Sequence, residues 1–192
     1  SMLSQPRLVL GLLGFFAAAV AAPLPAGATA AADPRAFIST LVAQGVDLLK
    51  DQQMPEAQRE QRFGALLEEG FDVPRIARFV LGGYWRSASP QDRAQFTRDF
   101  EQWVIATYLA RFRGYSGETV TVIGAQPIDA DTTIVHSRVT RPNGPAAQVD
   151  WRVRKNGNDY RITDVQVEGV SMALTQRDEF GAVIQRNGGT VA

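Results

Sequence analysis

Few residues of this chain have side chains that could carry out acid–base, nucleophilic or metal chemistry. His136 is the only histidine, and the sequence contains no cysteine. Nucleophilic catalysis needs a base beside the nucleophile, and a zinc site needs about four nitrogen, sulfur or oxygen ligands. The sequence has no GxSxG or SxxK motif and no glycine-rich phosphate loop. We therefore predict that the protein is not an enzyme and holds no cofactor or metal.

The charge balance argues against a nucleic-acid partner. The 20 lysines and arginines are matched by 20 aspartates and glutamates, so the formal net charge is zero. A nucleic-acid-binding protein usually carries a clear excess of basic residues on one face. Hydrophobic residues make up 45% of the 192 residues, which is enough for one sizeable core. Apolar surface is therefore the feature that a function of this chain would use.

Two residues keep an enzymatic alternative open. His136 falls inside a predicted strand, where a lone histidine is more often structural than catalytic. Asp164 falls at an expected irregularity of the sheet, where a carboxylate more often holds a backbone turn. A small enzyme acting on an apolar substrate would need one of these two side chains to face a cavity. A pure interaction module with a filled core is a further alternative.

Capping residues followed by proline mark the starts of several helices. Asp33 and Ser89 each stand directly before a proline, and Asp72 stands two residues before one. Apolar residues then recur at helical spacing until a glycine or a proline interrupts them. We predict helices over residues 33–49, 56–69, 72–81, 89–113 and 173–186.

The hydrophobic pattern changes to the alternation of β-strands in the second half of the chain. The expected strands cover residues 119–123, 132–140, 147–153 and 160–167, with a hairpin turn at Asn156-Gly157. The apolar phase shifts after Ile162, which predicts a β-bulge near Thr163 and Asp164. Helices, then strands, then one helix predict an α+β fold with a four- to five-stranded antiparallel sheet.

The first 32 residues have the pattern of a secretory signal peptide. An apolar run over residues 8–20 follows the single charge of Arg7, and small residues with helix-breaking prolines come next. The run is short for a membrane-spanning helix. Ser1 before Met2 indicates an expression scar. We predict a signal peptide over residues 1–32 and a single domain over residues 33–192.

Two short blocks carry a family resemblance. The first is VLGGYWR at residues 80–86, followed by Phe96 and Phe100, and the second is DVQVEGVS at residues 164–171, followed by Arg177 and Phe180. Together they resemble the MlaC/toluene-tolerance family of periplasmic lipid-binding proteins. The resemblance implies a curved sheet packed against helices, NTF2-like or cystatin-like in outline, with a deep cavity between the helices and the sheet.

The resemblance also implies a function. Proteins of this family carry phospholipid through the periplasm between an outer-membrane lipoprotein complex and an inner-membrane ABC transporter, and so maintain outer-membrane lipid asymmetry. The acyl chains enter the cavity and the headgroup stays near solvent. A hopanoid or another polycyclic lipid is an alternative cargo. We expect a monomer that docks transiently on these membrane complexes.

Apolar residues of the expected helices and of one sheet face are the candidates for lining the cavity. We expect Gly82 and Gly83 to allow a positive φ or a close backbone approach, and to act as a hinge. We expect Ser171 to cap the last helix. Arg177 is expected to pair with Asp164 in preference to a lipid phosphate. The candidate lipid-binding residues are Phe79, Tyr84, Trp85, Tyr108, Phe112, Val120, Val122, Val135, Val149, Trp151, Val153, Val165, Val167, Met172 and Phe180.

Overall fold

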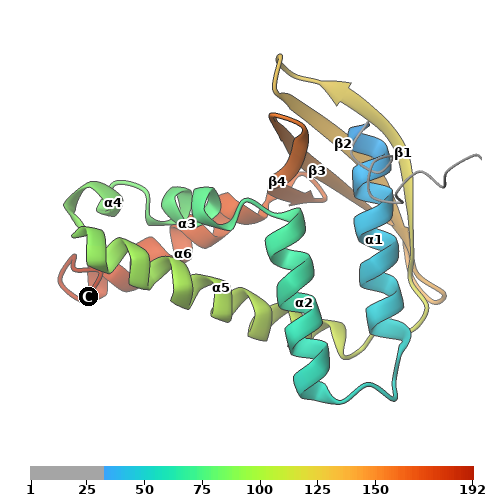
Figure 1. Cartoon of the computed structure of the whole chain (residues 1–192), viewed down its shortest axis with the longest axis horizontal. Coiled ribbons are helices and arrows are strands. Elements are labelled where there is room, and N and C mark those ends of the chain that lie inside the picture. The colour runs from blue at the N-terminus through green and yellow to red at the C-terminus, as the bar shows by residue number, and fades with distance from the viewer. Residues whose placement is uncertain (1–32) are drawn as a thin grey trace, which may run out of the picture.

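The structure is a computed structural model that describes residues 33–192 (Figure 1). The signal peptide predicted for residues 1–32 therefore lies outside the described residues. Within the described part of the chain, no helix combines the length and the apolar character needed to cross a membrane.

The helices begin and end close to the positions that the capping signals predict. Side-chain oxygens of Asp33, Asp72 and Ser89 accept hydrogen bonds from backbone N–H groups in the first turns that follow them. One element was not predicted: a single helical turn after the bend at Gly82. The helices are α1 (Pro34–Lys50), α2 (Glu56–Gly70), α3 (Val73–Leu81), α4 (Tyr84–Ser87), α5 (Pro90–Phe112) and α6 (Met172–Arg186).

One antiparallel sheet follows the chain order β1-β2-β3-β4-β5. The predicted bulge is confirmed, because Arg152 pairs with Asp164 while the next residue of β3 pairs with Ile162, which leaves Thr163 as the extra residue. The first strand is longer than predicted, since a second register shift after Val122 lets pairing continue. The strands are β1 (Thr119–Pro127), β2 (Thr132–Thr140), β3 (Ala147–Asn156), β4 (Asp159–Val167) and β5 (Val170–Ser171).

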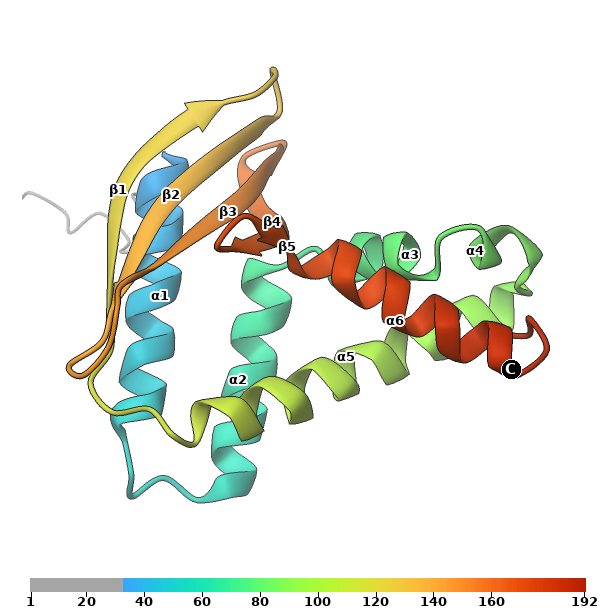
Figure 2. The same ribbon diagram turned by 180° about the vertical axis from the view of Figure 1, so that it is seen from behind.

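The helices divide into two groups around the curved sheet. Helix α1 lies along one face of the sheet, and α2 stands beside α1 (Figure 1). Helices α3, α4, α5 and α6 extend away from the sheet, and we call them the helical arm. Seen from behind, α6 leaves the sheet at β5 and runs along the arm (Figure 2). The predicted α+β fold is confirmed.

The described residues form two hydrophobic cores, and α2 contributes Leu67 to the core of the helical arm. The arm core contains the buried residues Leu67, Val73, Ala77, Val80, Phe100, Ile105 and Leu109. The sheet core contains the buried residues Ile38, Val135, Val153, Tyr160 and Ile162. Phe71, between α2 and α3, packs against both cores. Its backbone forms a bridge with Ile162, and the following N–H of Asp72 donates to the Ile162 carbonyl.

The backbone conformation at the bend after α3 requires a glycine at position 82. Its φ of 57° and ψ of −130° are strained for any residue with a side chain, and a Cβ there would lie 2.9 Å from Nε of Arg177. We expect Gly82→Ala to lower the free energy of unfolding by about 1–3 kcal/mol. Gly83 is the matched control, because its conformation is helical and a Cβ would meet open space. Urea unfolding of both variants tests this, and equal stabilities would contradict it.

Two carboxyl groups meet where α2 packs beside α5. Burial raises the pKa of Glu101, and the nearby carboxyl of Glu68 raises that pKa further through a hydrogen bond and charge repulsion. A raised pKa in the folded state means that ionised Glu101 opposes folding, and that this cost disappears as the pH falls through the raised pKa. Glu101→Gln should therefore increase the free energy of unfolding at pH 7 by less than about 1 kcal/mol.

The gain from Glu101→Gln should vanish below the ordinary glutamate pKa of 4.5. Urea unfolding across this pH range measures the effect. Glu69→Gln, at an exposed position of the same helix as Glu68, serves as the control. The same gain in both variants, or a gain that grows toward low pH, would contradict the assignment.

Candidate functional site

The sheet residues proposed to line a cavity share one face. In an antiparallel sheet, residues directly opposite one another point to the same side. Val122, Val149 and Val167 fall in one row of such partners, which also contains Ser137. Val135, Trp151 and Val165 form the next row. Val120 and Val153 have the same phase, so all eight predicted strand residues lie on what we call the inner face.

The inner face faces α1 and is covered unevenly. Ile38 of α1 packs in one core with Val135 and Val153, which are 0% and 1% exposed. Trp151 and Val165 are half-buried, and Val167 at the end of β4 is 36% exposed. The apolar face is therefore filled beneath α1 and becomes accessible toward β5.

A buried polar pair lies within the inner face. The Oγ–H of Ser137 donates to the carbonyl of Val149 at 2.6 Å, and Nε1–H of Trp151 donates to the same Oγ at 3.0 Å. These bonds satisfy the indole N–H, which would otherwise be costly to bury. The orientation of the Trp151 ring on the inner face is thus fixed by the hydroxyl of Ser137.

The predicted helical residues lie in the arm or at its junction with the sheet. Phe180 of α6 packs against Phe96, Phe100 and Trp103 of α5, with ring centroids 5.8, 5.9 and 5.0 Å away. Phe112, at the end of α5, meets Phe63 of α2 edge to face. Phe180 thus belongs to the aromatic packing of the arm and lies away from the inner face.

Aromatic side chains at the bend between α3 and α5 lie against arginines. Arg177 lies over the ring of Phe79 at 5.0 Å, and both Arg78 and Arg93 lie over the ring of Trp85, at 5.6 and 4.9 Å from its centroid. These contacts hold Phe79 and Trp85 at the surface of the arm. Tyr84, beside them, is half-buried.

A hydrogen bond connects Tyr108 of α5 to the N-terminal half of α6. Its hydroxyl accepts a bond of 3.1 Å from the side-chain amide of Gln176, which is buried. Met172, the first residue of α6, is half-buried and follows directly on β5. Tyr108 and Met172 therefore lie where the arm adjoins the sheet, whereas Phe79, Trp85 and Phe180 do not.

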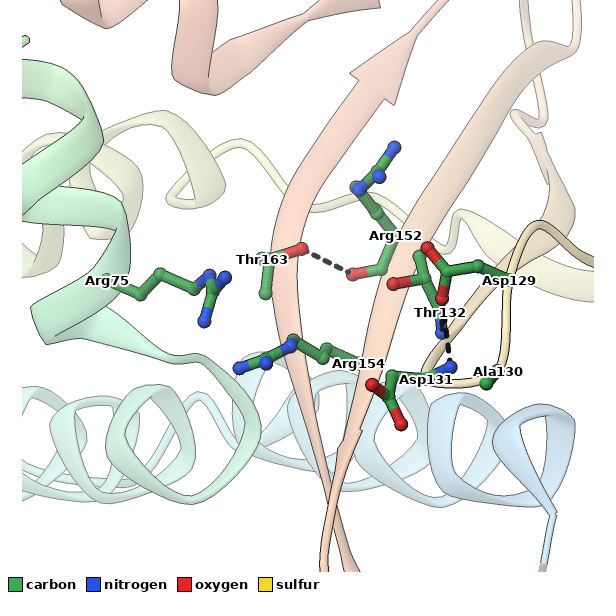
Figure 3. Close-up of a pocket in the computed structure, with 8 residues that line it drawn as sticks. All are labelled: Arg75, Asp129, Ala130, Asp131, Thr132, Arg152, Arg154 and Thr163. Carbon is green, nitrogen blue, oxygen red and sulfur yellow. Dashed lines mark hydrogen bonds between the residues drawn. The ribbon is translucent and has the colours of Figure 1, made fainter.

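Two open recesses occur among the described residues. A recess of about 430 Å³ lies between α3 and the outer side of β3 and β4, and polar residues line it (Figure 3). Another, of about 390 Å³, lies between α6 and the bend at Gly82 and Gly83. Tyr84 is the predicted lipid-binding residue that lines one of them. The cavity predicted between the helices and the sheet stays a prediction.

The two candidate acid–base residues have structural partners. His136 points to the outer face of the sheet, where its Nδ1 lies 2.8 Å from the carboxylate of Asp150. Asp164 accepts hydrogen bonds from the Val165 and Ala173 N–H groups and from the Ser171 hydroxyl. Neither residue lines the two recesses.

Ser171 caps α6, as predicted, but the expected ion pair between Arg177 and Asp164 is wrong. The Ser171 hydroxyl accepts from the Leu174 N–H at 3.1 Å while donating to Asp164. Both carboxylate oxygens of Asp164 are used at the start of α6, whereas the Arg177 guanidinium lies over the ring of Phe79. Arg177 of α6 therefore packs against the end of α3 and the bend at Gly82.

Several residues that lie on the inner face or pack against it are not among the candidate lipid-binding residues. Ile38, Leu41 and Val42 of α1 pack on the sheet, and the helical spacing of apolar residues in α1 was the signal for them. Ser137 lies in phase with Val135, so alternation along β2 placed it on this face. Phe71 had no such signal, because its role depends on contacts with both cores.

The fold and the inner face define an α+β protein whose curved antiparallel sheet presents an apolar surface to its helices. The sequence model of the MlaC protein family matches residues 39–191, and the chain belongs to that family.

Two curated relatives and one solved structure are similar to this chain. Toluene tolerance protein ttg2D of Pseudomonas putida is 28% identical over 105 residues, covering 55% of this chain and 49% of that protein. The intermembrane phospholipid transport system binding protein MlaC of Haemophilus influenzae is 23% identical over 114 residues, covering 57% of this chain and 53% of that protein. The chain thus spans about half the length of the curated relatives it matches.

The solved structure supports the fold. It is a phospholipid-binding protein from Ralstonia solanacearum in complex with a phospholipid, with a TM-score of 0.71 and 24% identity. The alignment covers 83% of this chain and 91% of that one. The arrangement of sheet and helical arm therefore occurs in a solved protein.

Proposed function

We propose that this protein is a periplasmic carrier that holds phospholipid acyl chains against the inner face of its sheet and shuttles lipid between membrane complexes. The observation that carries the proposal is the continuous apolar inner face, which is filled under α1 and accessible toward β5. The two membrane complexes would be an inner-membrane ABC transporter complex and an outer-membrane lipoprotein complex.

Apolar burial is sufficient to drive such binding. Each methylene that leaves water contributes about 0.8 kcal/mol, so one long acyl chain gains roughly 10 kcal/mol in a dry site. Such a site needs an apolar lining and a polar mouth but no reacting group. The Ser137–Trp151 pair supports this use of the inner face, because its polar atoms already have partners and do not repel an acyl chain.

The names of the relatives point in the same direction. The relative from Haemophilus influenzae is named for intermembrane phospholipid transport, and the Ralstonia solanacearum protein was solved with a phospholipid. Because these proteins are distant, the cargo, the periplasmic location and the docking on membrane complexes are proposals for this chain. We further propose that it acts as a monomer without a catalytic step, and that residues 1–32 direct it to the periplasm.

Native mass spectrometry of the protein purified from a Gram-negative host tests the proposal. The expected result is a stoichiometric mass addition that organic extraction identifies as phospholipid. A hopanoid from a hopanoid-producing host would change the cargo but keep the carrier. A lipid-free mass together with no uptake from added phospholipid vesicles would overturn the proposal.

His136→Ala separates the carrier from an enzyme acting on an apolar substrate. Because His136 lies on the outer face and contacts Asp150, its loss should leave the bound-lipid stoichiometry unchanged within about twofold. The free energy of unfolding should fall by about 0.5–1.5 kcal/mol, as is usual for the loss of one half-buried hydrogen bond. The bound-lipid mass and a urea curve measure both effects. Loss of bound lipid in this variant would contradict the assignment of the site to the inner face.

A further inference from the structure

The polar recess on the outer side of the sheet contains arginines without an ion-pair partner. Arg75 comes from the first turn of α3, and Arg152 and Arg154 come from β3. Within the described part of the chain, no carboxylate lies within 4.0 Å of their guanidinium nitrogens. Arg75 and Arg154 turn toward the same space beside Thr163 (Figure 3). Like charges directed into one recess repel each other unless an anion lies between them.

The two carboxylates at the far side of the recess do not form ion pairs with Arg75 or Arg154. Asp129 accepts hydrogen bonds of 2.8 Å from the backbone N–H groups of Asp131 and Thr132. These bonds hold the pKa of Asp129 below its ordinary value, with the charge of Arg152 adding to the effect. Asp131 lies on the loop between β2 and β1, apart from the guanidinium groups of Arg75 and Arg154 (Figure 3). The carboxylates thus organise the loop, and the side of the recess nearest α3 stays positive.

We propose that this outer recess binds a phosphate group, held by the guanidinium groups of Arg75 and Arg154 beside Thr163. Planar guanidinium groups bind the oxygens of phosphate in pairs, which favours this anion over chloride. The recess is open to solvent and has a volume of about 430 Å³, which leaves room for an esterified phosphate. The same chemistry would serve a free phosphate or the phosphate of a lipid headgroup at a membrane surface. The site lies on the opposite side of the sheet from the inner face, so it does not depend on the proposed lipid cargo.

A nuclear magnetic resonance titration with inorganic phosphate tests the site directly. The expected result is saturable shifts of the Arg75 and Arg154 Nε–H signals and of the Thr163 amide, which chloride at equal ionic strength does not reproduce. Arg75→Gln combined with Arg154→Gln should weaken phosphate binding by at least about tenfold. Arg138→Gln is the matched control, because Arg138 is exposed on the same outer face but does not line the recess. It should change binding by less than about twofold.

Vesicle sedimentation identifies the source of the phosphate. Binding to phosphatidylglycerol vesicles that the double variant loses and Arg138→Gln keeps would indicate a lipid headgroup. Binding of inorganic phosphate without vesicle binding would indicate a soluble phosphate. Absence of saturable binding with both probes, or equal weakening by Arg138→Gln, would overturn the site. Arg75→Gln alone repeats the test if the double variant does not fold.

The lipid mass of the double variant separates this inference from the proposed function. We expect the variant to carry the same lipid mass as the unmodified protein, because Arg75 and Arg154 lie outside the inner face. Loss of phosphate binding with retained lipid supports two separate sites. Loss of lipid in the double variant, with its fold intact, would overturn the separation.

Discussion

Replacing Val167 with aspartate is expected to remove most of the lipid that the protein carries while leaving the fold intact. Val167 lies on the inner face opposite Val149 and is 36% exposed, so a carboxylate there has access to water in the lipid-free protein. An acyl chain seated on this face would have to desolvate that charge, which costs several kcal/mol. We expect bound lipid, measured by native mass spectrometry, to fall by at least about tenfold, equivalent to about 1.4 kcal/mol.

Thr121→Asp is the matched control for the Val167 variant. Thr121 lies between two inner-face valines of β1, so its side chain points to the outer face, where it is exposed opposite Arg138. It adds the same charge to the opposite side of the same sheet. Bound lipid should stay within about twofold of the unmodified protein, since no acyl chain would contact this side. Equal lipid loss in both variants would mean that net charge, and not the inner face, determines loading.

Replacing Asp164 with alanine is expected to produce the largest loss of stability. This carboxylate accepts hydrogen bonds of 2.8 Å from the Val165 N–H, 3.0 Å from the Ala173 N–H and 2.5 Å from the Ser171 hydroxyl. Removing it leaves two half-buried N–H groups without their acceptor and weakens the cap of α6. We expect the free energy of unfolding, measured with urea, to fall by about 2–4 kcal/mol.

Two further variants separate the hydrogen bonds of Asp164 from its charge. Asp164→Asn keeps a carbonyl oxygen for the N–H groups but loses the acceptor for the Ser171 hydroxyl. Its free energy of unfolding should therefore lie between those of the unmodified protein and Asp164→Ala. Glu179→Ala removes an exposed carboxylate from the same helix and should cost less than about 0.5 kcal/mol. A loss in Asp164→Ala no larger than in Glu179→Ala would contradict the capping role.

Local signals explain why most of the fold could be predicted from the sequence. Asp33 and Ser89 mark helix starts because their side chains bond to N–H groups that are near in sequence. The alternation along β3 sets the face on which Val149, Trp151 and Val153 lie. The phase shift after Ile162 marks the bulge, since one extra residue reverses the alternation. Each of these features depends on residues a few positions apart.

The sheet face that the strand residues share could be predicted from the sequence, whereas the contacts of the helix residues could not. Alternation placed eight strand residues on one face, and their register confirms that they share it. Helical spacing does not show which distant element a helix meets, so the packing of Phe180 on Phe96 and Phe100 could not be predicted from it. Arg177 and Asp164 were paired by charge alone. The partners they actually have, Phe79 and the first turn of α6, are set by tertiary packing.

The side chain of Phe71 has a consequence for cooperativity. It packs against both hydrophobic cores, while the backbone beside it is bonded to Ile162 of the sheet. The helical arm cannot leave the sheet without exposing this ring and breaking that bond. We therefore expect the arm and the sheet to unfold as one cooperative unit, in which amide hydrogens of both cores exchange through the same slowest opening reaction.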